Sequence, residues 1–466
     1  MRDGHGGISR RAFARGAGAA AISAASYARA LGANERVGVG YIGFGLIGKR
    51  HVLDFKDLED VNNVGVAEAH SGRRDEACAL IGGKVEGYSD FRKLLDRKDV
   101  DAVVVSTPDH WHALMAMMAC DAGKDVYVEK PTTLFVREGR WMLDVAKRTK
   151  RVVIVGTQQR SGPHYQRARE LVHQGRIGRV VGVRMASYRN IMPGFGTPPD
   201  TTPPPELDWE MWLGPTAYHR YNPNRGIYHF RWFWDTSGGQ MTNLGQHALD
   251  IVYWFLDLDA PRAVTSVGGR FALKDNGETP DTQDALFEFP GLVVGWEHRE
   301  VSRGQETMGL LEFQGTDGTM VVNRRGFEIV PDRQIDPSAA VPRFGQSHPT
   351  GGPPKTDQAA PNRNAGGFRT EPLKDTSGNE YDQFRRHARH FLDCIKSRQT
   401  PVSDLDSGHR VVTACHLANL SLRLGGRRLR WDAANETIPG DSEAAAMLER
   451  PYRSPWDAVR DRVLKG

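Results

Sequence analysis

Long uninterrupted apolar stretches are missing from this sequence of 466 residues. None approaches the run of about 18 apolar residues that a membrane-crossing helix needs, so we do not expect a membrane span. With 39% hydrophobic and 26% charged residues, the composition is typical of a globular protein. The length is sufficient for two hydrophobic cores, so we expect two domains rather than one.

Cysteine is scarce, and the common metal-binding patterns are missing. The four cysteines are Cys78, Cys120, Cys394 and Cys415, and no pair of them has the spacing of a metal or redox motif. The sequence contains no H-E-x-x-H pattern and no cluster of cysteines. We therefore expect buried free thiols and no metal site.

A large excess of one charge is missing outside the N-terminus. The net charge is +5, but residues 1–30 contain five arginines and one aspartate, which leaves about +1 for the rest of the chain. This balance gives no reason to expect a nucleic-acid partner.

The first thirty residues have the parts of an export signal in the expected order. Ser9–Phe13 contains a twin-arginine pattern, a weakly apolar stretch follows at 16–28, and Ala28–Ala30 resembles a cleavage site. This order predicts a twin-arginine signal peptide over 1–30 and a periplasmic or secreted protein. A disordered or helical extension is the alternative.

Strands and helices alternate in the first half of the chain. Short apolar runs predict strands at 37–42, 61–67, 102–106, 125–128 and 152–155. Apolar residues at helical spacing predict helices at 51–58, 112–122 and 137–150. This alternation predicts a Rossmann-type domain over 33–157, with a doubly wound parallel sheet.

The second half has the pattern of an α+β domain with an open, mostly antiparallel sheet. Strand-like runs occur at 180–187, 263–271, 282–289, 292–299, 308–314 and 319–323. We place this domain at 158–330, and we expect its long segment over 188–235 to be a lid or binding loop. Residues 331–380 read as a flexible insertion. Residues 381–466, with helices near 381–397 and 407–424, are expected to complete the second domain.

A glycine-rich loop follows the first predicted strand and opens a helix. It has the pattern G-x-G-x-x-G and consists of Gly43, Phe44, Gly45, Leu46, Ile47 and Gly48. In a dinucleotide site the first glycine allows a tight turn, the second allows the diphosphate to approach, and the third allows close packing of helix and strand.

The next strand predicts which nicotinamide coenzyme is bound. Glu68 ends that strand, where a carboxylate can accept a hydrogen bond from a ribose 2′-hydroxyl, so we expect NAD. Arg73 and Arg74 lie close by and keep NADP open as the alternative, because they could hold a 2′-phosphate. Alternatively, these two arginines are solvent-exposed residues at the start of a helix and bind no coenzyme.

Three further motifs carry a family resemblance: T-P-D-H-W-H at 107–112, E-K-P at 129–131 and G-G-Q-M-T-N-L-G-Q-H-A-L-D at 238–250. Together with the glycine loop they resemble the Gfo/Idh/MocA superfamily of oxidoreductases over about 36–330, and more loosely over 381–460. The segments 240–243 and 451–456 resemble a secreted bacterial branch. The family implies a Rossmann domain, a second domain with an open antiparallel sheet, and an active site between them.

The resemblance also implies roles for single residues. Those expected at the coenzyme, besides the glycine loop, Glu68 and Arg73, are Thr107, Pro108, His110, His112, Glu129 and Lys130. Lys130 is expected beside the reacting carbon, where it can stabilise a developing alkoxide. His247 is expected to act as general base or proton relay.

The chain departs from the family pattern at Asn243, where many members have aspartate. At helical spacing Asn243 and His247 would share a face and both reach the pocket. An uncharged asparagine cannot stabilise an imidazolium, so the division of base catalysis between Lys130 and His247 stays open.

Polar and aromatic residues near the expected pocket suit a carbohydrate. The candidates for substrate binding, besides Asn243 and His247, are Arg160, Tyr165, Tyr188, Arg189, Arg231 and Trp232. Packing or solvation is the alternative for each of them. By analogy with the family we expect a homo-oligomer, either a dimer or a tetramer.

Export would limit the chemistry, because a released coenzyme is not recycled outside the cytoplasm. We therefore expect a tightly bound coenzyme that is turned over within one active site. The sequence leaves three functions open: an oxidoreductase that acts on a sugar or polyol, an NAD-using glycosidase that works by transient oxidation and elimination, and a non-catalytic sugar-binding protein.

Overall fold

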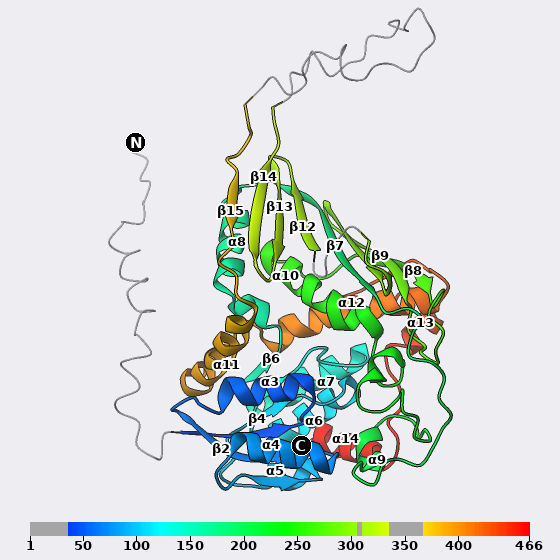
Figure 1. Cartoon of the computed structure of the whole chain (residues 1–466). Helices are drawn as coiled ribbons and strands as arrows, with labels where there is room; N and C mark the ends of the chain where they lie inside the picture. Colours follow the sequence, from blue (N-terminus) through cyan, green and yellow to red (C-terminus); the bar gives the residue numbers. More distant parts are fainter. Residues whose placement is uncertain (1–35, 305–309, 335–366) are drawn as a thin grey trace, which may run out of the picture.

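The computed structural model describes residues 36–304, 310–334 and 367–466 of the chain (Figure 1). The predicted signal peptide at 1–30 and most of the predicted insertion at 331–380 lie outside the described residues. Two sheets organise the described part, as the sequence predicts. In this part of the chain, no helix has the length and apolar character needed to cross a membrane.

The first sheet has six strands, all parallel, in the order β3-β2-β1-β4-β5-β6. Its strands are β1 (Val37–Ile42), β2 (Val61–Ala67), β3 (Glu86–Tyr88), β4 (Ala102–Val105), β5 (Asp125–Val128) and β6 (Val153–Val155). Its helices are α3 (Leu46–Phe55), α4 (Ser71–Ile81), α5 (Phe91–Leu95), α6 (Asp109–Asp121) and α7 (Val136–Thr149). This is the predicted doubly wound domain.

Strands β1, β4, β5 and β6 are buried on both faces, which explains their largely apolar sequences. Alternate residues of β4 belong to different hydrophobic clusters: Val103 and Val105 to the cluster that contains α6 and α7, and Val104 to the cluster that contains α3. The sequence pattern did not predict α4, β3 and α5. In α4 only Ala77 is buried, so this surface helix carries little apolar periodicity.

The second sheet has ten strands, and its main path is β15-β14-β13-β12-β7-β10-β9-β8-β16, with β11 paired to β7. Only β7 and β10 pair in parallel. The strands are β7 (Val180–Asn190), β8 (Ala263–Gly269), β9 (Thr282–Phe289), β10 (Leu292–Arg299), β11 (Val301–Ser302), β12 (Leu310–Gly315), β13 (Gly318–Asn323), β14 (Gly326–Pro331), β15 (Leu373–Asp375) and β16 (Leu429–Arg430).

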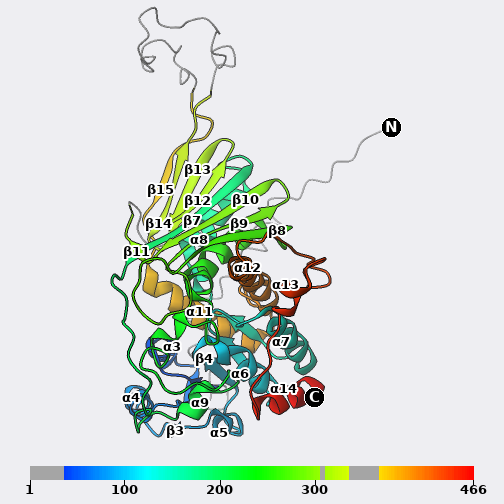
Figure 2. The ribbon, with the colours of Figure 1, turned by 90° about the vertical axis from the view of Figure 1, so that its right-hand side faces the viewer.

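Helices pack on one face of this second sheet, between it and the first domain (Figures 1 and 2). The helical elements of this half are η2 (Gln158–Ser161), α8 (Pro163–His173), α9 (Trp209–Leu213), η3 (His229–Trp232), η4 (Met241–Gly245), α10 (Gln246–Leu256), α11 (Glu380–Ser397), α12 (Leu405–Arg423), α13 (Ser442–Ala446) and α14 (Trp456–Lys465).

The C-terminal helices contact both domains. Helix α12 does pack against β8 and α10. Helices α11 and α14 instead contribute apolar residues to the two clusters of the Rossmann domain, among them Phe391 and Trp456. Strands β14 and β15 also extend the sheet beyond residue 330, into the stretch that we predicted to be a flexible insertion.

Candidate active site

The three glycines of the 43–48 loop differ in the space around them. Gly43 has a φ of 89°, and a Cβ there would lie 2.8 Å from the backbone of Ser106. A Cβ on Gly48 would lie 2.3 Å from the carbonyl oxygen of Gly43. A Cβ on Gly45 would meet only the Arg73 Nη1 atom, 3.9 Å away. Open space beside the second glycine fits a diphosphate group.

Glu68 ties this loop to the end of β2. Its Oε2 accepts a hydrogen bond from the Phe44 N–H at 2.6 Å, and its Oε1 accepts one from the His70 N–H at 2.9 Å. Each carboxylate oxygen keeps a further lone pair, which can accept a bond from a ribose hydroxyl. A 2′-phosphate would be repelled by the same carboxylate, so this acceptor fits the ribose of NAD.

A cavity opens at this loop, with about 920 Å³ of empty space that includes its opening to solvent. From the Rossmann domain it is lined by predicted coenzyme residues: Gly43, Phe44, Gly45, Leu46, Ile47, Glu68, Arg73, Thr107 and Pro108. Residues of the segment that follows β7 line it as well, among them Leu207, Tyr228 and Arg231. The cavity therefore has walls from both domains.

His110 and His112 lie in α6 and do not line this cavity. The His110 Nε2 atom is 2.9 Å from the Trp212 carbonyl oxygen. The His112 ring lies between two carbonyl oxygens, 2.6 Å from that of Pro131 and 2.8 Å from that of Thr107. Both histidines thus hold the loops around the cavity in place.

Glu129 supports the backbone next to Lys130. Its Oε1 pairs with His51 Nε2 at 2.7 Å, and its Oε2 accepts a hydrogen bond from the Lys130 N–H at 3.0 Å. Burial, the largest single cause, favours a higher pKa for Glu129, but the hydrogen bond from His51 and the charges of His51, Lys130 and His112 together outweigh it and lower the pKa below its usual value. Glu129 is therefore an ionised support for the E-K-P motif.

Lys130 follows β5 at the carboxyl edge of the sheet, next to the loop after β4. Its Nζ donates to the Asn243 backbone oxygen at 3.0 Å and to Asn243 Oδ1 at 2.9 Å. Burial is the main cause that lowers the pKa of Lys130 to about 8, and the nearby Arg231 cation acts in the same direction. An amine with this pKa can give up and accept a proton near neutral pH.

The spacing of Asn243 and His247 predicts one regular helical face, but the structure interrupts the regular helix between them. Met241–Gly245 forms a π-helical turn, and the regular helix α10 starts at Gln246. Such turns often occur at functional sites. Burial and the Lys130 cation lower the pKa of His247 well below its usual value. The imidazole is therefore uncharged at neutral pH.

Two important residues of the site were not identified from the sequence. Gln240 Oε1 accepts a hydrogen bond from Asn243 Nδ2 at 3.1 Å, and Gln240 Nε2 donates to Glu300 Oε1 at 2.8 Å. Glu300 is fully buried and also pairs with Arg189. A polar chain therefore runs from Lys130 to a buried carboxylate. Glu300 lies outside every motif, so only its position in the fold reveals it.

The predicted substrate residues separate into two groups. Trp232 donates from Nε1 to Glu300 Oε2 at 2.7 Å, and Arg231 lines the cavity. Arg160 lies elsewhere, in a buried ion pair with Asp250. Tyr165 is buried in the core of the second domain, where its hydroxyl accepts a hydrogen bond from Gln159 at 3.1 Å. Tyr188 bonds to Glu297 on the second sheet.

Comparisons with known proteins agree with this architecture. Residues 37–157 match the model described as "Oxidoreductase family, NAD-binding Rossmann fold". Residues 171–268 and 369–458 match "Oxidoreductase family, C-terminal alpha/beta domain". Among solved structures, GenD2 from gentamicin A biosynthesis in complex with NAD has a TM-score of 0.61 at 22% identity, covering 87% of this chain and 99% of its own.

Related sequences come from bacteria. Levoglucosan dehydrogenase of Pseudarthrobacter phenanthrenivorans is 31% identical over 321 residues, which cover 62% of this chain and 74% of the dehydrogenase. A glycosyl hydrolase family 109 protein of Shewanella sp. (strain MR-4) is 34% identical over 155 residues, or 32% of this chain. The chain spans about a third of the length of that relative. Both domains of the family, the NAD-binding Rossmann domain and the C-terminal domain, are present in order. The chain therefore belongs to the Gfo/Idh/MocA family.

Proposed function

We propose that this protein is an exported NAD-dependent oxidoreductase that acts on a secondary alcohol of a sugar, polyol or glycoside and keeps its coenzyme bound. The observation that carries the proposal is the state of Lys130. Its amine lies at the carboxyl edge of the Rossmann sheet, is held by two oxygens of Asn243, and has a pKa of about 8. The sugar dehydrogenase among the relatives supports the substrate class.

Lys130 has the geometry of a proton acceptor. When the amine is uncharged, its two N–H bonds can donate to the two Asn243 oxygens, which leaves the lone pair for the substrate hydroxyl. A bound nicotinamide supplies the hydride acceptor. As the alcohol is oxidised, its hydroxyl proton passes to Lys130 Nζ, and the resulting ammonium remains hydrogen-bonded to Asn243.

His247 takes a different part in this proposal. Because its pKa is well below the usual value, it does not hold a proton at neutral pH and is not the base that accepts the substrate proton. No hydrogen bond to His247 is present among the described residues, and its Nδ1 is buried. The uncharged ring is available to orient the substrate through one hydrogen bond.

The experiment that tests the proposal is an optical titration of the purified protein with a panel of sugars and glycosides. We expect bound NAD to be reduced by one of them, with an absorbance band of reduced nicotinamide that stays with the protein on gel filtration. The Lys130→Met variant should still bind NADH, but no sugar should reduce its bound NAD. If neither coenzyme nor any sugar changes the signal of the wild type, the catalytic function is excluded.

The family 109 relatives favour a second candidate, a glycosidase that oxidises the sugar transiently, eliminates the glycosidic group, adds water to the resulting double bond and then reduces the product. An uncharged Lys130 amine could also accept a proton from carbon in that reaction. Product analysis separates the two candidates. A free sugar released from a glycoside with no net change in NAD indicates the glycosidase, and an oxidised sugar indicates the dehydrogenase.

The export part of the proposal rests on the N-terminal twin-arginine pattern. Cell fractionation tests it. The full chain should be recovered outside the cytoplasm, and a variant with Arg10→Lys and Arg11→Lys should remain inside. Equal distribution of both chains would contradict export by this route.

We further propose a homo-oligomer that forms through the open face of the second sheet. Leu286 and Val293 of neighbouring strands are 54% and 50% exposed, although both are large and apolar. Light scattering should give a multiple of the chain mass, and Leu286→Asp should reduce it. A wild-type mass equal to one chain would contradict this proposal.

A further inference from the structure

The segment between β7 and the π-helical turn spans both domains. We call residues 191–235 the crossing segment. It leaves the second sheet, reaches the Rossmann domain at α9, and returns past η3 (Figures 1 and 2). Such a long connection needs attachment at both ends to hold one conformation.

At the Rossmann domain, the crossing segment is attached directly beyond Glu68. The Ser71 N–H donates to the Glu206 carbonyl oxygen at 2.8 Å, and the Asp208 N–H donates to the Ala69 carbonyl oxygen at 3.0 Å. Further along, Trp111 Nε1 donates to the carbonyl oxygens of Met211 and Trp212 at 3.1 and 3.0 Å. These bonds hold the segment against the ribose end of the cavity.

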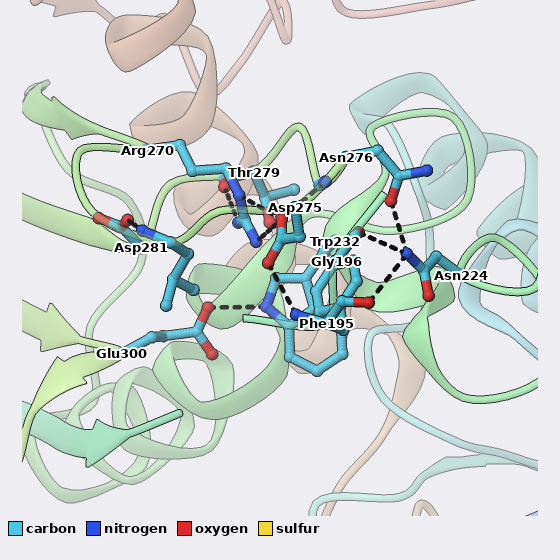
Figure 3. Close-up of polar contacts among 12 residues, drawn as sticks. Phe195, Gly196, Asn224, Trp232, Arg270, Asp275, Asn276, Thr279, Asp281 and Glu300 are labelled. Carbon is cyan, nitrogen blue, oxygen red and sulfur yellow. Dashed lines mark hydrogen bonds and ion pairs between the residues drawn. The ribbon is translucent and has the colours of Figure 1, made fainter. Parts of the chain in front are cut away.

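At the second domain, the crossing segment is attached through a partly buried polar cluster (Figure 3). Asn224 Nδ2 donates to the Gly196 carbonyl oxygen at 2.9 Å and to Asn276 Oδ1 at 2.8 Å. The Asp275 carboxylate accepts bonds from Arg270 and from the Phe195 N–H. On the other side of this cluster Trp232 bonds to Glu300.

Between the two attachments, the crossing segment lines the same cavity as the glycine loop. The residues that it contributes to the wall are Leu207, Met211, Trp212, Ile227, Tyr228, Phe230 and Arg231. Most are apolar, which fits the flat face of a nucleotide base or a nicotinamide ring. Arg231 is the cation among them.

Arg231 has no carboxylate partner in the described part of the chain. Its one hydrogen bond goes to the Tyr228 carbonyl oxygen at 3.3 Å, and its guanidinium lies 4.5 Å from the centre of the Phe230 ring. Arg73 lines the same cavity from the Rossmann side, beside Gly45. Two guanidinium groups in one cavity favour an anionic ligand, and the diphosphate is the anionic part of NAD.

We propose that the crossing segment is the second wall of the coenzyme site, that Arg231 binds the diphosphate from the side opposite the glycine loop, and that this wall keeps the coenzyme bound between turnovers. This inference rests on the proposed NAD-dependent function. It also explains how an exported enzyme of this kind avoids losing a coenzyme that it cannot replace.

Coenzyme release is the readout that tests this proposal. The full chain is loaded with NADH, and loss of its fluorescence is followed after a chase with excess NAD. We expect Arg231→Met to release NADH at least about tenfold faster than the wild type, because it loses a charge-assisted contact. Arg231→Lys should fall between them, because it keeps the charge but not the planar fork.

Arg220→Met is the matched control, because Arg220 lies on the same segment but is exposed and outside the cavity. Its release rate should equal that of the wild type. A second measurement is amide hydrogen exchange at Ser71 and Asp208, where the crossing segment is attached. NADH should slow this exchange in the wild type and slow it less in Arg231→Met.

The outcomes separate this inference from the proposed function. If Arg231→Met releases NADH at the wild-type rate but raises the KM for the sugar, the inference is overturned, Arg231 belongs to the substrate site, and the oxidoreductase remains. If the wild type and Arg231→Met both release NADH rapidly and the wild type still oxidises the sugar, the crossing segment does not retain the coenzyme. The proposed oxidoreductase function then remains. If the wild type binds no coenzyme, the proposed function itself fails.

Discussion

The two walls of the coenzyme cavity are built in different ways. The Rossmann wall centres on one contiguous stretch, Gly43–Ile47, and on Glu68 after the next strand, with Thr107 and Pro108 beside them. The opposite wall consists of separated residues of the crossing segment, such as Leu207 and Arg231, which two sets of tertiary contacts hold in place. The first wall depends on local backbone geometry, and the second depends on how the two domains meet.

The largest expected effect would show whether the Rossmann side supplies the reacting group. Lys130→Met removes the proposed proton acceptor, so kcat should fall roughly 10³-fold. The NADH dissociation constant should stay within about twofold, because Lys130 does not line the cavity. Steady-state rates and a fluorescence titration measure both quantities. A residual rate within about tenfold of the wild type would assign the base to His247 or to another group.

The next prediction concerns the second-domain side, where Glu300 ends the polar chain from Lys130. Glu300→Gln leaves Arg189 and Trp232 without their carboxylate, so the free energy of unfolding should fall by about 3 kcal/mol. Denaturant unfolding measures this loss. Glu297→Gln is the control, because that carboxylate is 34% exposed and its loss should cost under about 1 kcal/mol. Equal losses of unfolding free energy in the two variants would show that burial does not make the Glu300 carboxylate more stabilising than the Glu297 carboxylate.

Two glycines on the same wall allow a sharper comparison. Gly43→Ala should destabilise the fold by about 2 kcal/mol, because its φ is 89° and its Cβ would overlap the Ser106 backbone. Gly45→Ala should leave stability unchanged but weaken NADH binding roughly tenfold, because its methyl group takes space beside the diphosphate. Thermal unfolding and NADH titration give the two values. The reverse pattern would contradict the assigned roles.

The smallest effect is expected on the pH dependence of catalysis, which the contact between Lys130 and Asn243 should set. The uncharged form of Lys130 accepts the proton, so kcat/KM should rise tenfold per pH unit below about 8 and level off above it. Asn243→Asp places a carboxylate beside the ammonium and raises the pKa of Lys130. The profile should then move to higher pH by about one unit, and the rate at pH 7 should fall about tenfold. An unmoved profile would exclude Lys130 as the titrating group.

The sequence predicted the fold best where a pattern is local. The strands at 37–42, 61–67 and 125–128 were predicted at their observed bounds, because buried parallel strands are continuous apolar runs. Helix α4 was not predicted, because it buries almost nothing. Strand β15 was not predicted either, because three residues that pair at a sheet edge carry no periodicity of their own.

The candidate site shows the same division. Lys130 and Asn243 were identified from motifs, and the structure joins them by two hydrogen bonds. Arg160 also lies beside a predicted strand, yet it pairs with Asp250 in the interior. Composition cannot distinguish an arginine that binds a ligand from one that neutralises a buried carboxylate, since both need the same side chain.

The sequence by itself determined the Rossmann domain, the glycine loop and the lysine at the end of β5, because each depends on residues close together in the chain. Only the tertiary structure decided that Glu300 is linked to Asn243 through Gln240, that Arg231 lines the same cavity as the glycine loop, and that α11 and α14 pack against the first domain. These placements depend on contacts between residues far apart in the sequence. Burial and neighbouring charges, which set the pKa of Lys130 near 8, likewise arise only when the two domains meet.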